Sequence, residues 1–242
     1  MKAMVLAAGL GTRMAPLTQK TPKPLIPLNG KPFLFYTLKY LAHYGIREIV
    51  INLHHLGDQM RAFLGDGASH GVKIVYSEEP EILGTGGGIK KAEKLLGKEP
   101  FLVINSDLLT DIRLDHFIRF HFEKRGLASL VLREDPLVDR YGAIEINGSS
   151  RIRRILGKGA EDSGPLQKRM FAGIHILDPA VLEVVPPGIF CSITDTYIDL
   201  LSQGAALYGF ETADYWADIG NLDQYRQINA SMADNKIPLS YL

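Results

Sequence analysis

The 242-residue sequence contains a single cysteine, no long hydrophobic run and no excess of charge of either sign. One thiol, Cys191, cannot form an internal disulfide, a CxxC redox motif or a zinc ribbon, which fits a reducing cytoplasm. No stretch approaches the ~20 apolar residues that a membrane-spanning helix needs. The N-terminal apolar run stops at Gly9, too early for the hydrophobic region of a signal peptide. We therefore expect a cytoplasmic protein with no membrane partner.

The balance of charge limits the partners further. The chain carries 27 Lys and Arg against 27 Asp and Glu, so its formal net charge is zero. A neutral protein has no general positive field that would hold nucleic acid, and any anion must therefore bind at a local site. An apolar fraction of 46% with 22% charged residues is typical of a folded globular protein.

The first half of the chain alternates between strand and helix patterns. Continuously apolar or β-branched runs predict strands at 3–8, 48–53, 72–76, 101–104 and 128–132. Helical spacing of the apolar residues between these strands predicts one helix that begins near Pro32. It predicts three others at 56–64, 89–96 and 114–125. This order predicts an α/β fold with a doubly wound, mainly parallel sheet, whose ligands bind beyond the carboxyl ends of the strands.

The pattern changes after about residue 133. Residues 141–146 and 151–156 flank the turn pair Asn147-Gly148 and predict a β-hairpin. A strand at 170–177, a short helix from Pro179, a strand at 215–219 and a helix from Leu222 complete an α+β portion. Without a repeat or a flexible linker, we expect one domain, 1–242, with halves at 1–132 and 133–242.

A glycine-containing loop, Ala8-Gly9-Leu10-Gly11-Thr12-Arg13-Met14, directly follows the first predicted strand. Glycines there let backbone N–H groups approach a phosphate closely. The loop is not a dinucleotide-binding GxGxxG motif, because Met14 stands in place of the third glycine, and it is not a Walker A loop. Taken alone, it is explained equally well as a tight strand exit.

The segment that follows aims a positive charge. Three prolines in Thr21-Pro22-Lys23-Pro24-Leu25-Ile26-Pro27 restrict the backbone around Lys23. The run LAAGLGTRMAPLT followed by TPKPLIP resembles the signature of the sugar-1-phosphate nucleotidyltransferases, closest to the short N-acetylmuramate-1-phosphate uridylyltransferase and mannose-1-phosphate guanylyltransferase group. The resemblance implies a Rossmann-like fold of the glycosyltransferase-A type. Because the chain stops near residue 242, we expect it to lack the C-terminal β-helix of many relatives.

Other segments extend the resemblance over nearly the whole chain. Leu83–Gly88 resembles the second glycine-rich loop of the family, and Asn105-Ser106-Asp107 replaces its usual Gly-Asp. Gly157-Lys158-Gly159 stands where the family has Glu-Lys-Pro. Phe171–His175 is similar to a conserved strand of the family, and Trp216–Gly220 resembles its W-x-D-I-G motif.

The resemblance assigns roles to these residues. The halves 1–132 and 133–242 become the nucleotide-binding and sugar-phosphate-binding halves. Arg13, Lys23 and Asp107 are the expected catalytic residues, and Asp107 and Asp218 are the expected ligands of Mg²⁺. The expected nucleotide-binding residues also include Ala8, Gly9, Gly11, Thr12, Gly84 and Asn105. The expected sugar-phosphate-binding residues are Thr85, Gly86, Glu145, Lys158 and Gly173.

The implied reaction converts a nucleoside triphosphate and a sugar-1-phosphate into a nucleotide-sugar and pyrophosphate. A nucleoside triphosphate repels an anionic acceptor, and Mg²⁺ between two carboxylates offsets that charge. The sugar phosphate is already ionised near neutral pH, so no general base is needed. The pairs UTP with N-acetylmuramate-1-phosphate and GTP with mannose- or heptose-1-phosphate remain open, in a monomer or small homo-oligomer.

Two alternative hypotheses, from other functional classes, have less support in the sequence. A regulatory protein that binds a nucleotide or nucleotide-sugar without catalysis would not need Arg13, Lys23, Asp107 and Asp218 together. A dinucleotide-dependent oxidoreductase would need a glycine at Met14.

Overall fold

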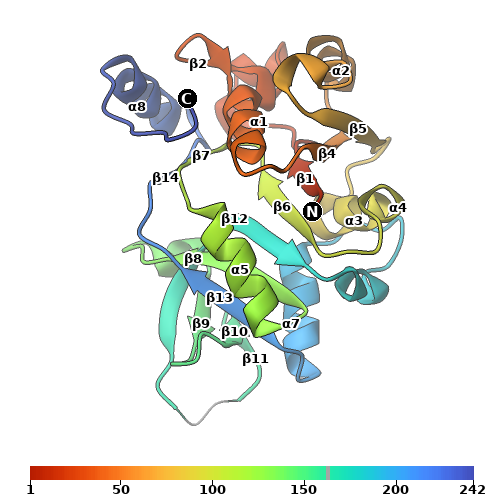
Figure 1. Cartoon of the computed structure of the whole chain (residues 1–242), viewed down its shortest axis with the longest axis vertical. Coiled ribbons are helices and arrows are strands. Elements are labelled where there is room, and N and C mark those ends of the chain that lie inside the picture. The colour runs from red at the N-terminus through yellow and green to blue at the C-terminus, as the bar shows by residue number, and fades with distance from the viewer. Residues whose placement is uncertain (162–163) are drawn as a thin grey trace. The chain divides into compact units, whose positions relative to one another are not determined.

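The computed structural model describes residues 1–161 and 164–242, which form two compact units. The first unit comprises residues 1–82, 104–112 and 214–242, and the second comprises 83–103 and 113–213. Figure 1 gives the labels of the elements. None of the helices in the described ranges combines the length and the apolar character that a bilayer-spanning segment needs.

The first unit is built on parallel strands. Strand β1 (Ala3–Leu6) pairs with β4 (Glu48–Leu53), and β4 pairs with β5 (Lys73–Glu78), in parallel in both cases. The last two residues of β6 (Phe101–Asn105) belong to this unit, and β6 lies next to β1. Strand β1 shows no polar alternation because its first three residues are fully buried, as in a sheet that is covered on both faces.

Shorter elements complete the first unit. Strand β7 (Leu108–Thr110) pairs antiparallel with β14 (Trp216–Asp218). An apolar core joins Ile228 and Met232 of α8 to Phe33 and Tyr36 of α1. The other elements are α1 (Phe33–His43), α2 (Gly57–Leu64), α8 (Leu222–Ala233), β2 (Pro27–Leu28), β3 (Lys31–Pro32) and 3₁₀ turns at Thr12–Met14, Leu17–Gln19, Lys23–Leu25 and Ala68–His70.

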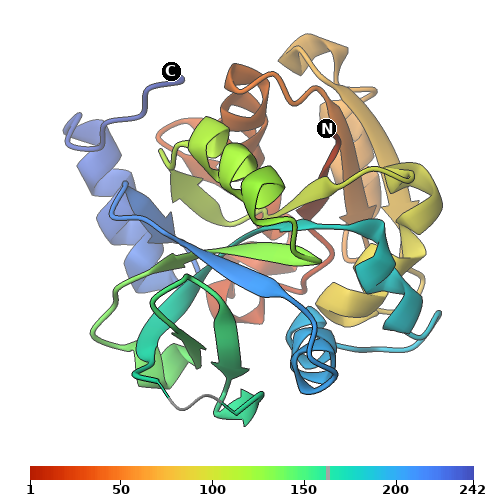
Figure 2. The ribbon, with the colours of Figure 1, turned by 60° about the horizontal axis from the view of Figure 1, so that its bottom comes forward.

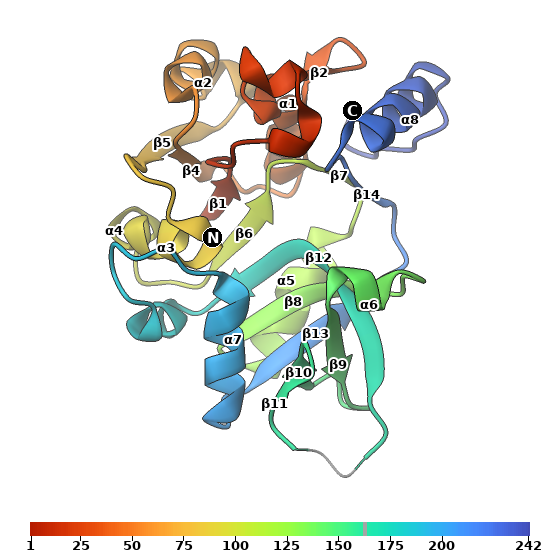
Figure 3. The same ribbon diagram turned by 180° about the vertical axis from the view of Figure 1, so that it is seen from behind.

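The second unit contains a largely antiparallel sheet. Its strands lie in the order β11-β10-β9-β12, and β8 pairs antiparallel with β12 and parallel with β13. Figures 1 and 3, from opposite sides, show α5 on one face of this sheet and α7 on the other, and Figure 2 shows the strands between the two helices. The strands are β8 (Ala128–Arg133), β9 (Ala143–Ile146), β10 (Ile152–Ile155), β11 (Lys158–Gly159), β12 (Gln167–Leu177) and β13 (Leu207–Glu211). The helices are α3 (Gly84–Lys91), α4 (Glu93–Leu96), α5 (Leu114–Lys124), α6 (Val138–Tyr141), a 3₁₀ helix at Pro179–Val184 and α7 (Ile193–Ser202).

The α/β fold expected from the sequence is confirmed, with two local corrections. The predicted helix 89–96 is wrong in its start, because α3 begins five residues earlier, inside the glycine-rich run. The predicted hairpin forms from β9 and β10, but its turn is longer than the pair Asn147-Gly148. Asn147 Oδ1 accepts hydrogen bonds from the backbone N–H groups of Ser149 and Arg151, and Ser150 adopts the left-handed conformation.

Candidate active site

The loop after β1 is held in a tight conformation. Gly11 has a φ of 65°, and a Cβ there would lie 2.7 Å from Thr18 Cγ2. Thr18 Oγ1 donates a hydrogen bond to Gly11 O at 2.9 Å. The chain then turns through Thr12–Met14 and buries Met14 completely. Because only glycine has both the conformational freedom and the small size needed here, the sequence must place one at position 11.

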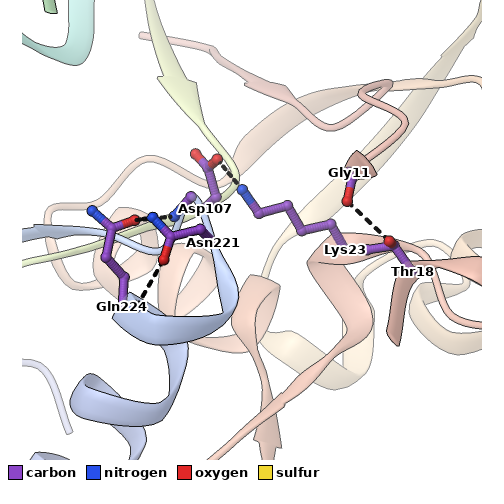
Figure 4. A network of polar contacts seen from close by, with 7 residues as sticks. Gly11, Thr18, Lys23, Asp107, Asn221 and Gln224 are labelled. Carbon is purple, nitrogen blue, oxygen red and sulfur yellow. Dashed lines mark hydrogen bonds and ion pairs between the residues drawn. The ribbon is translucent and has the colours of Figure 1, made fainter. Parts of the chain in front are cut away.

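Lys23 is directed at a carboxylate. It begins a 3₁₀ turn between the buried prolines Pro22 and Pro24, which limit its backbone. Its Nζ lies 2.5 Å from Asp107 Oδ2, and only 11% of the lysine side chain is exposed. Figure 4 shows Lys23 extended from its turn toward Asp107, with the Thr18–Gly11 hydrogen bond beside it.

Two short strands hold a pair of carboxylates together. Asp107 directly precedes β7, and Asp218 ends β14, where it stands opposite Leu108 in the ladder. The backbone N–H of Ile219 donates to Asp107 O at 3.0 Å. Burial, followed by the negative charge of Asp107, raises the pKa of Asp218 to about 6, although the charges of Lys23 and Arg13 oppose that shift. The fold therefore keeps two acidic groups close together at some electrostatic cost.

Gly220 leaves space for both Arg13 and the carboxylate of Asp218. A Cβ on Gly220 would lie 3.1 Å from Asp218 Oδ2 and 3.2 Å from Arg13 Nη1. The backbone N–H of Gly220 donates to Gln224 Oε1, and Asn221 Oδ1 caps α8 by accepting from the N–H groups of Asp223 and Gln224. Figure 4 shows this cap next to Asp107. Gly220 was not among the predicted site residues, although it ends the W-x-D-I-G motif.

A cavity of about 320 Å³ in the first unit brings most of the predicted phosphate-binding residues together. Ala8, Asn105 and Asp218 are not part of its described lining, although Ala8 and Asn105 adjoin lining residues in the chain. Its lining includes Gly9, Gly11, Thr12, Arg13, Lys23, Asp107 and Gly220. Glycines, two cationic side chains and a carboxylate thus line one cavity, which is the combination that a polyphosphate with its counter-ion requires.

The donor set fits Mg²⁺ that is held together with a phosphate. Within the described residues, no cluster of three or more His, Cys, Asp or Glu side chains could enclose a metal by itself. Magnesium, however, is usually held by one or two carboxylates, with substrate phosphates and water completing the shell. Asp107 and Asp218 supply two carboxylates of that kind.

The glycines of the second glycine-rich run, at the start of α3, allow close packing against another segment of the second unit. Backbone N–H groups of Gly86 and Gly87 both donate to Cys191 O, and Thr85 Oγ1 accepts from the N–H of Ile193 at 2.9 Å. A Cβ on Gly87 would lie 2.5 Å from Ile189 O. The glycines therefore allow residues 189–193 to cross the start of α3 at close range. The N–H group of Gly86, one of the residues expected to bind the sugar phosphate, therefore already has a backbone partner.

The second unit has its own cavity, of about 230 Å³. The predicted residues Glu145, Lys158 and Gly173 are not part of its described lining, but Ile144, Ile155 and Phe171 near them are. Its lining residues with polar groups are Ser192, Thr194 and Asp195 at the start of α7, and Tyr197 one turn later, whose hydroxyl contacts His175 Nδ1. The capping pattern Ser192-Ile193-Thr194-Asp195 was a usable signal for this helix start.

The three predicted residues near this cavity differ in their surroundings. Glu145 Oε2 lies 3.7 Å from Arg154 Nη1, so this carboxylate has a cationic partner. Lys158 is exposed on β11. Gly173 has a φ of 74°, where the pairing of β12 with β8 shifts register. The conformation of Gly173 therefore has a backbone reason that is independent of any ligand.

Comparison with known proteins identifies the family. A family model described as nucleotidyl transferase matches residues 2–235. The chain belongs to the nucleotidyl transferase family. Two solved structures share its fold. HddC of Yersinia pseudotuberculosis, complexed with GMP-PN, is 27% identical with a TM-score of 0.79, covering 96% of this chain and 99% of that one. A Bacillus anthracis protein in complex with a sucrose is 24% identical with a TM-score of 0.83. This match covers 100% of this chain and 98% of that one.

Curated relatives include members with different substrates in their names. The N-acetylmuramate alpha-1-phosphate uridylyltransferase of Neisseria meningitidis is 36% identical over 235 residues, or 95% of this chain and 97% of the relative. The UTP--glucose-1-phosphate uridylyltransferase of Synechocystis is 32% identical over 94% of this chain. The mannose-1-phosphate guanyltransferase of Aspergillus fumigatus is 35% identical over 91%. The chain spans 62% and 61% of the lengths of these last two relatives.

Proposed function

We propose that this protein transfers a nucleotidyl group from a nucleoside triphosphate to a sugar-1-phosphate and releases pyrophosphate. The observation that carries the proposal is the cavity of the first unit, which the glycine loop, Arg13, Lys23 and Asp107 line together, with Asp218 close enough to feel their charges. The names of the Neisseria, Synechocystis and Aspergillus relatives support the same reaction class.

The residues of this cavity divide the work by charge and shape. Backbone N–H groups of Gly9, Gly11 and Thr12 bind the phosphates of the nucleotide. Arg13 binds the terminal phosphates in bidentate fashion and stabilises the departing pyrophosphate. Lys23, a compact charge, stabilises the charge that builds on the α-phosphate.

Magnesium, held by Asp107 and Asp218, would neutralise phosphate charge when bound. An oxygen of the sugar-1-phosphate attacks the α-phosphorus, the new P–O bond forms, and the bond to the β-phosphate oxygen breaks with its electron pair going to pyrophosphate. The attacking oxygen is already ionised near neutral pH, so no side chain has to remove a proton. Catalysis consists of positioning and electrostatic stabilisation.

We place the sugar in the cavity of the second unit, next to the segments that carry Glu145, Lys158 and Gly173. For the nucleotide and sugar, we propose either UTP with N-acetylmuramate-1-phosphate or GTP with mannose- or heptose-1-phosphate. The names of the Neisseria and Aspergillus relatives support N-acetylmuramate-1-phosphate and mannose-1-phosphate. Either pair supplies an activated sugar for cell-envelope or polysaccharide synthesis. The partners are then small molecules, handled in the cytoplasm by a monomer or small homo-oligomer.

A pyrophosphate-release assay tests this proposal. Four nucleoside triphosphates are combined with a panel of sugar-1-phosphates, with Mg²⁺ or with excess chelator. We expect release only when both substrates and Mg²⁺ are present, and loss of most turnover in Asp107→Asn with the fold intact. Nucleotide binding without pyrophosphate release from any pair would instead support the regulatory alternative.

A further inference from the structure

Asn52 is a polar residue in an otherwise apolar, buried part of β4. Residues 49–53 are all buried, and Asn52, with 2% of its surface exposed, is the one polar residue among these five. A buried amide costs free energy unless its hydrogen-bonding groups have partners. Asn52 Oδ1 accepts from the backbone N–H of Ala7 at 2.7 Å, and Asn52 Nδ2 donates to Glu79 Oε1 at 2.7 Å. Because a backbone N–H can only donate, the contact with Ala7 fixes the direction of the amide.

The peptide group between Leu6 and Ala7 is held from two sides. Its N–H donates to Asn52, and its carbonyl oxygen accepts from the N–H of Ser106 at 3.1 Å. Leu6 and Ala7 line the cavity of the first unit, where β1 passes into the glycine loop. Ser106 directly precedes Asp107. This peptide group therefore connects the start of the glycine loop to the segment that carries Asp107 and to the side chain of Asn52.

Glu79 holds the other end of the Asn52 amide. It directly follows β5 and is only 3% exposed. Its backbone N–H donates to Leu53 O at 2.8 Å, and His54 Nδ1 lies 2.8 Å from its carbonyl oxygen. Because a carbonyl oxygen only accepts, the Nδ1 of His54 carries the hydrogen of this contact. The carboxylate that meets Asn52 thus extends from a backbone that is fixed through both its N–H and its carbonyl group.

We propose that Asn52 and Glu79 form a buried clamp that positions the glycine loop for the phosphates of the nucleoside triphosphate. The clamp sets the direction of the peptide group before Ala7, and thereby the point from which residues 9–13 approach the phosphates. Neither clamp residue belongs to the described lining of the cavity, so both are positioning residues that act through Ala7. The inference rests on the proposed function, because it assumes that this loop binds the triphosphate.

Reversal of the donor and the acceptor tests the clamp. Asn52→Asp keeps an acceptor for Ala7 but places a second carboxylate against Glu79, so the dissociation constant of the Mg²⁺–triphosphate complex should rise by about 10-fold or more. Glu79→Gln alone should change it by less than about 3-fold, because the amide oxygen of glutamine still accepts from Asn52. The double variant Asn52→Asp with Glu79→Gln again pairs one donor with one acceptor, and its dissociation constant should return to within about 3-fold of the wild type.

Binding is measured by titration calorimetry well below the melting temperature, with the nucleoside triphosphate that the wild type binds most tightly. The KM for the sugar-1-phosphate should change by less than about 3-fold in the same variants, because the loop contacts the other substrate. Asn52→Ser gives a second test without added charge. Its side chain is one bond shorter and cannot reach both partners, so its dissociation constant should also rise by about 10-fold.

The control is Tyr36→Phe, which removes the buried hydrogen bond from the Tyr36 hydroxyl to Leu28 O in the same unit and leaves the cavity lining unchanged. It should lower the melting temperature without changing the dissociation constant, as a merely structural role of Asn52 would also do. Wild-type affinity in folded Asn52→Asp or Asn52→Ser, or a double variant no better than Asn52→Asp, would overturn the inference.

The same measurements separate the clamp from the proposed function. A wild type that binds the triphosphate but releases no pyrophosphate with any sugar phosphate would refute the proposed function, while the dissociation constants would still decide on the clamp. Absence of triphosphate binding by the wild type would overturn both.

Discussion

Lys23 is positioned by its own turn and by the carboxylate it meets. Buried prolines on both sides restrict its backbone, and Asp107 fixes the far end of the side chain. In the proposed reaction, a charge so constrained would need little further ordering to stabilise the charge that develops on the α-phosphate. The sequence alone indicated this restriction, because the prolines flank the lysine directly.

Replacement of Lys23 separates transition-state stabilisation from substrate binding. Lys23→Ala should lower kcat by about 10²–10³, by analogy with the loss of one donor to a developing oxyanion, and change the KM for the triphosphate much less. The matched control is Lys20→Ala, because Lys20 is an exposed lysine in the same segment and does not line the cavity. A variant with normal kcat and a raised KM would show that Lys23 acts in ground-state binding.

The raised pKa of Asp218 makes the free energy of unfolding depend on pH. Its pKa is raised to about 6, so between the ordinary value of 3.8 and 6 the native state retains a proton that the unfolded chain has released. Ionised Asp218 therefore destabilises the metal-free protein increasingly as the pH rises through this window. Asp218→Asn should stabilise the metal-free protein at pH 8 by about 1–2 kcal/mol, and this gain should vanish near pH 4.

Urea titrations at the two pH values, without metal, measure this difference. Asp223→Asn is the control, since the side chain of Asp223 is 95% exposed on the same C-terminal segment. The same Asp218→Asn variant should lose the extra stability that Mg²⁺ with a triphosphate gives to the wild type. A variant that is less stable than the wild type at pH 8 would contradict the close pairing of the two carboxylates.

Among the elements, two short strands place the carboxylates that we propose as magnesium ligands. The β7–β14 ladder is only three residue pairs long, yet it brings together Asp107 and Asp218, which are far apart in the sequence. The cap of α8 at Asn221 directly follows and holds Gly220 through Gln224. A short ladder beside a capped helix can thus fix a site that no single element contains.

The glycine-rich start of α3 yields a prediction with an unusual sign. Gly→Ala in a helix normally stabilises a protein by up to about 1 kcal/mol. At Gly87, whose φ is not in the left-handed region, a Cβ would meet Ile189 O at 2.5 Å, and we expect Gly87→Ala to destabilise by about 1–3 kcal/mol instead. Gly148→Ala, in open space in the hairpin turn, should change stability by less than about 0.5 kcal/mol.

Denaturant unfolding of Gly87→Ala and Gly148→Ala measures the two changes in the free energy of unfolding. Cys191→Ser, which keeps the backbone carbonyl that Gly86 and Gly87 bind, should leave turnover largely intact. A stabilised Gly87→Ala protein would mean that residues 189–193 do not lie against α3.

Sequence patterns predicted the elements whose burial is regular. The apolar run of β1 and the helical spacing of α1 were sufficient, because each is buried on continuous faces. Strand β7 was missed because three residues are too few to show a period. Strand β13 was missed because Gly209 interrupts it, although β13 needs that glycine: a Cβ there would lie 2.3 Å from Leu132 Cδ1.

The residues of the candidate site also divide into those that the sequence identified and those that only the fold identifies. Arg13, Lys23 and Asp107 could be named because charged residues in a long motif are visible in the sequence. Gly220 could not, since its importance comes from the guanidinium and the carboxylate that the fold brings next to it. Space is a property of the folded chain that a residue pattern does not carry.

At the scale of the whole molecule, each unit has its own cavity and its own chemistry. The first cavity is lined by glycines, cations and a carboxylate, and the second is lined by apolar side chains and a few polar groups. Although the net charge of the protein is zero, two cationic side chains, Arg13 and Lys23, lie in the lining of the first cavity. We therefore assign phosphate recognition to the first unit and sugar recognition to the second.

The central claim, direct transfer supported by Arg13, Lys23 and the two carboxylates, is tested most directly by the stereochemistry at the α-phosphorus. Apart from Ser106, no serine, cysteine or histidine belongs to the described lining of the first cavity, so that lining offers no serine–histidine or cysteine–histidine pair for a covalent intermediate. A single in-line attack inverts the α-phosphorus, whereas two displacements through an enzyme-bound nucleotide restore it. With a chiral α-thiotriphosphate as substrate, we expect inversion, and net retention would contradict one-step transfer.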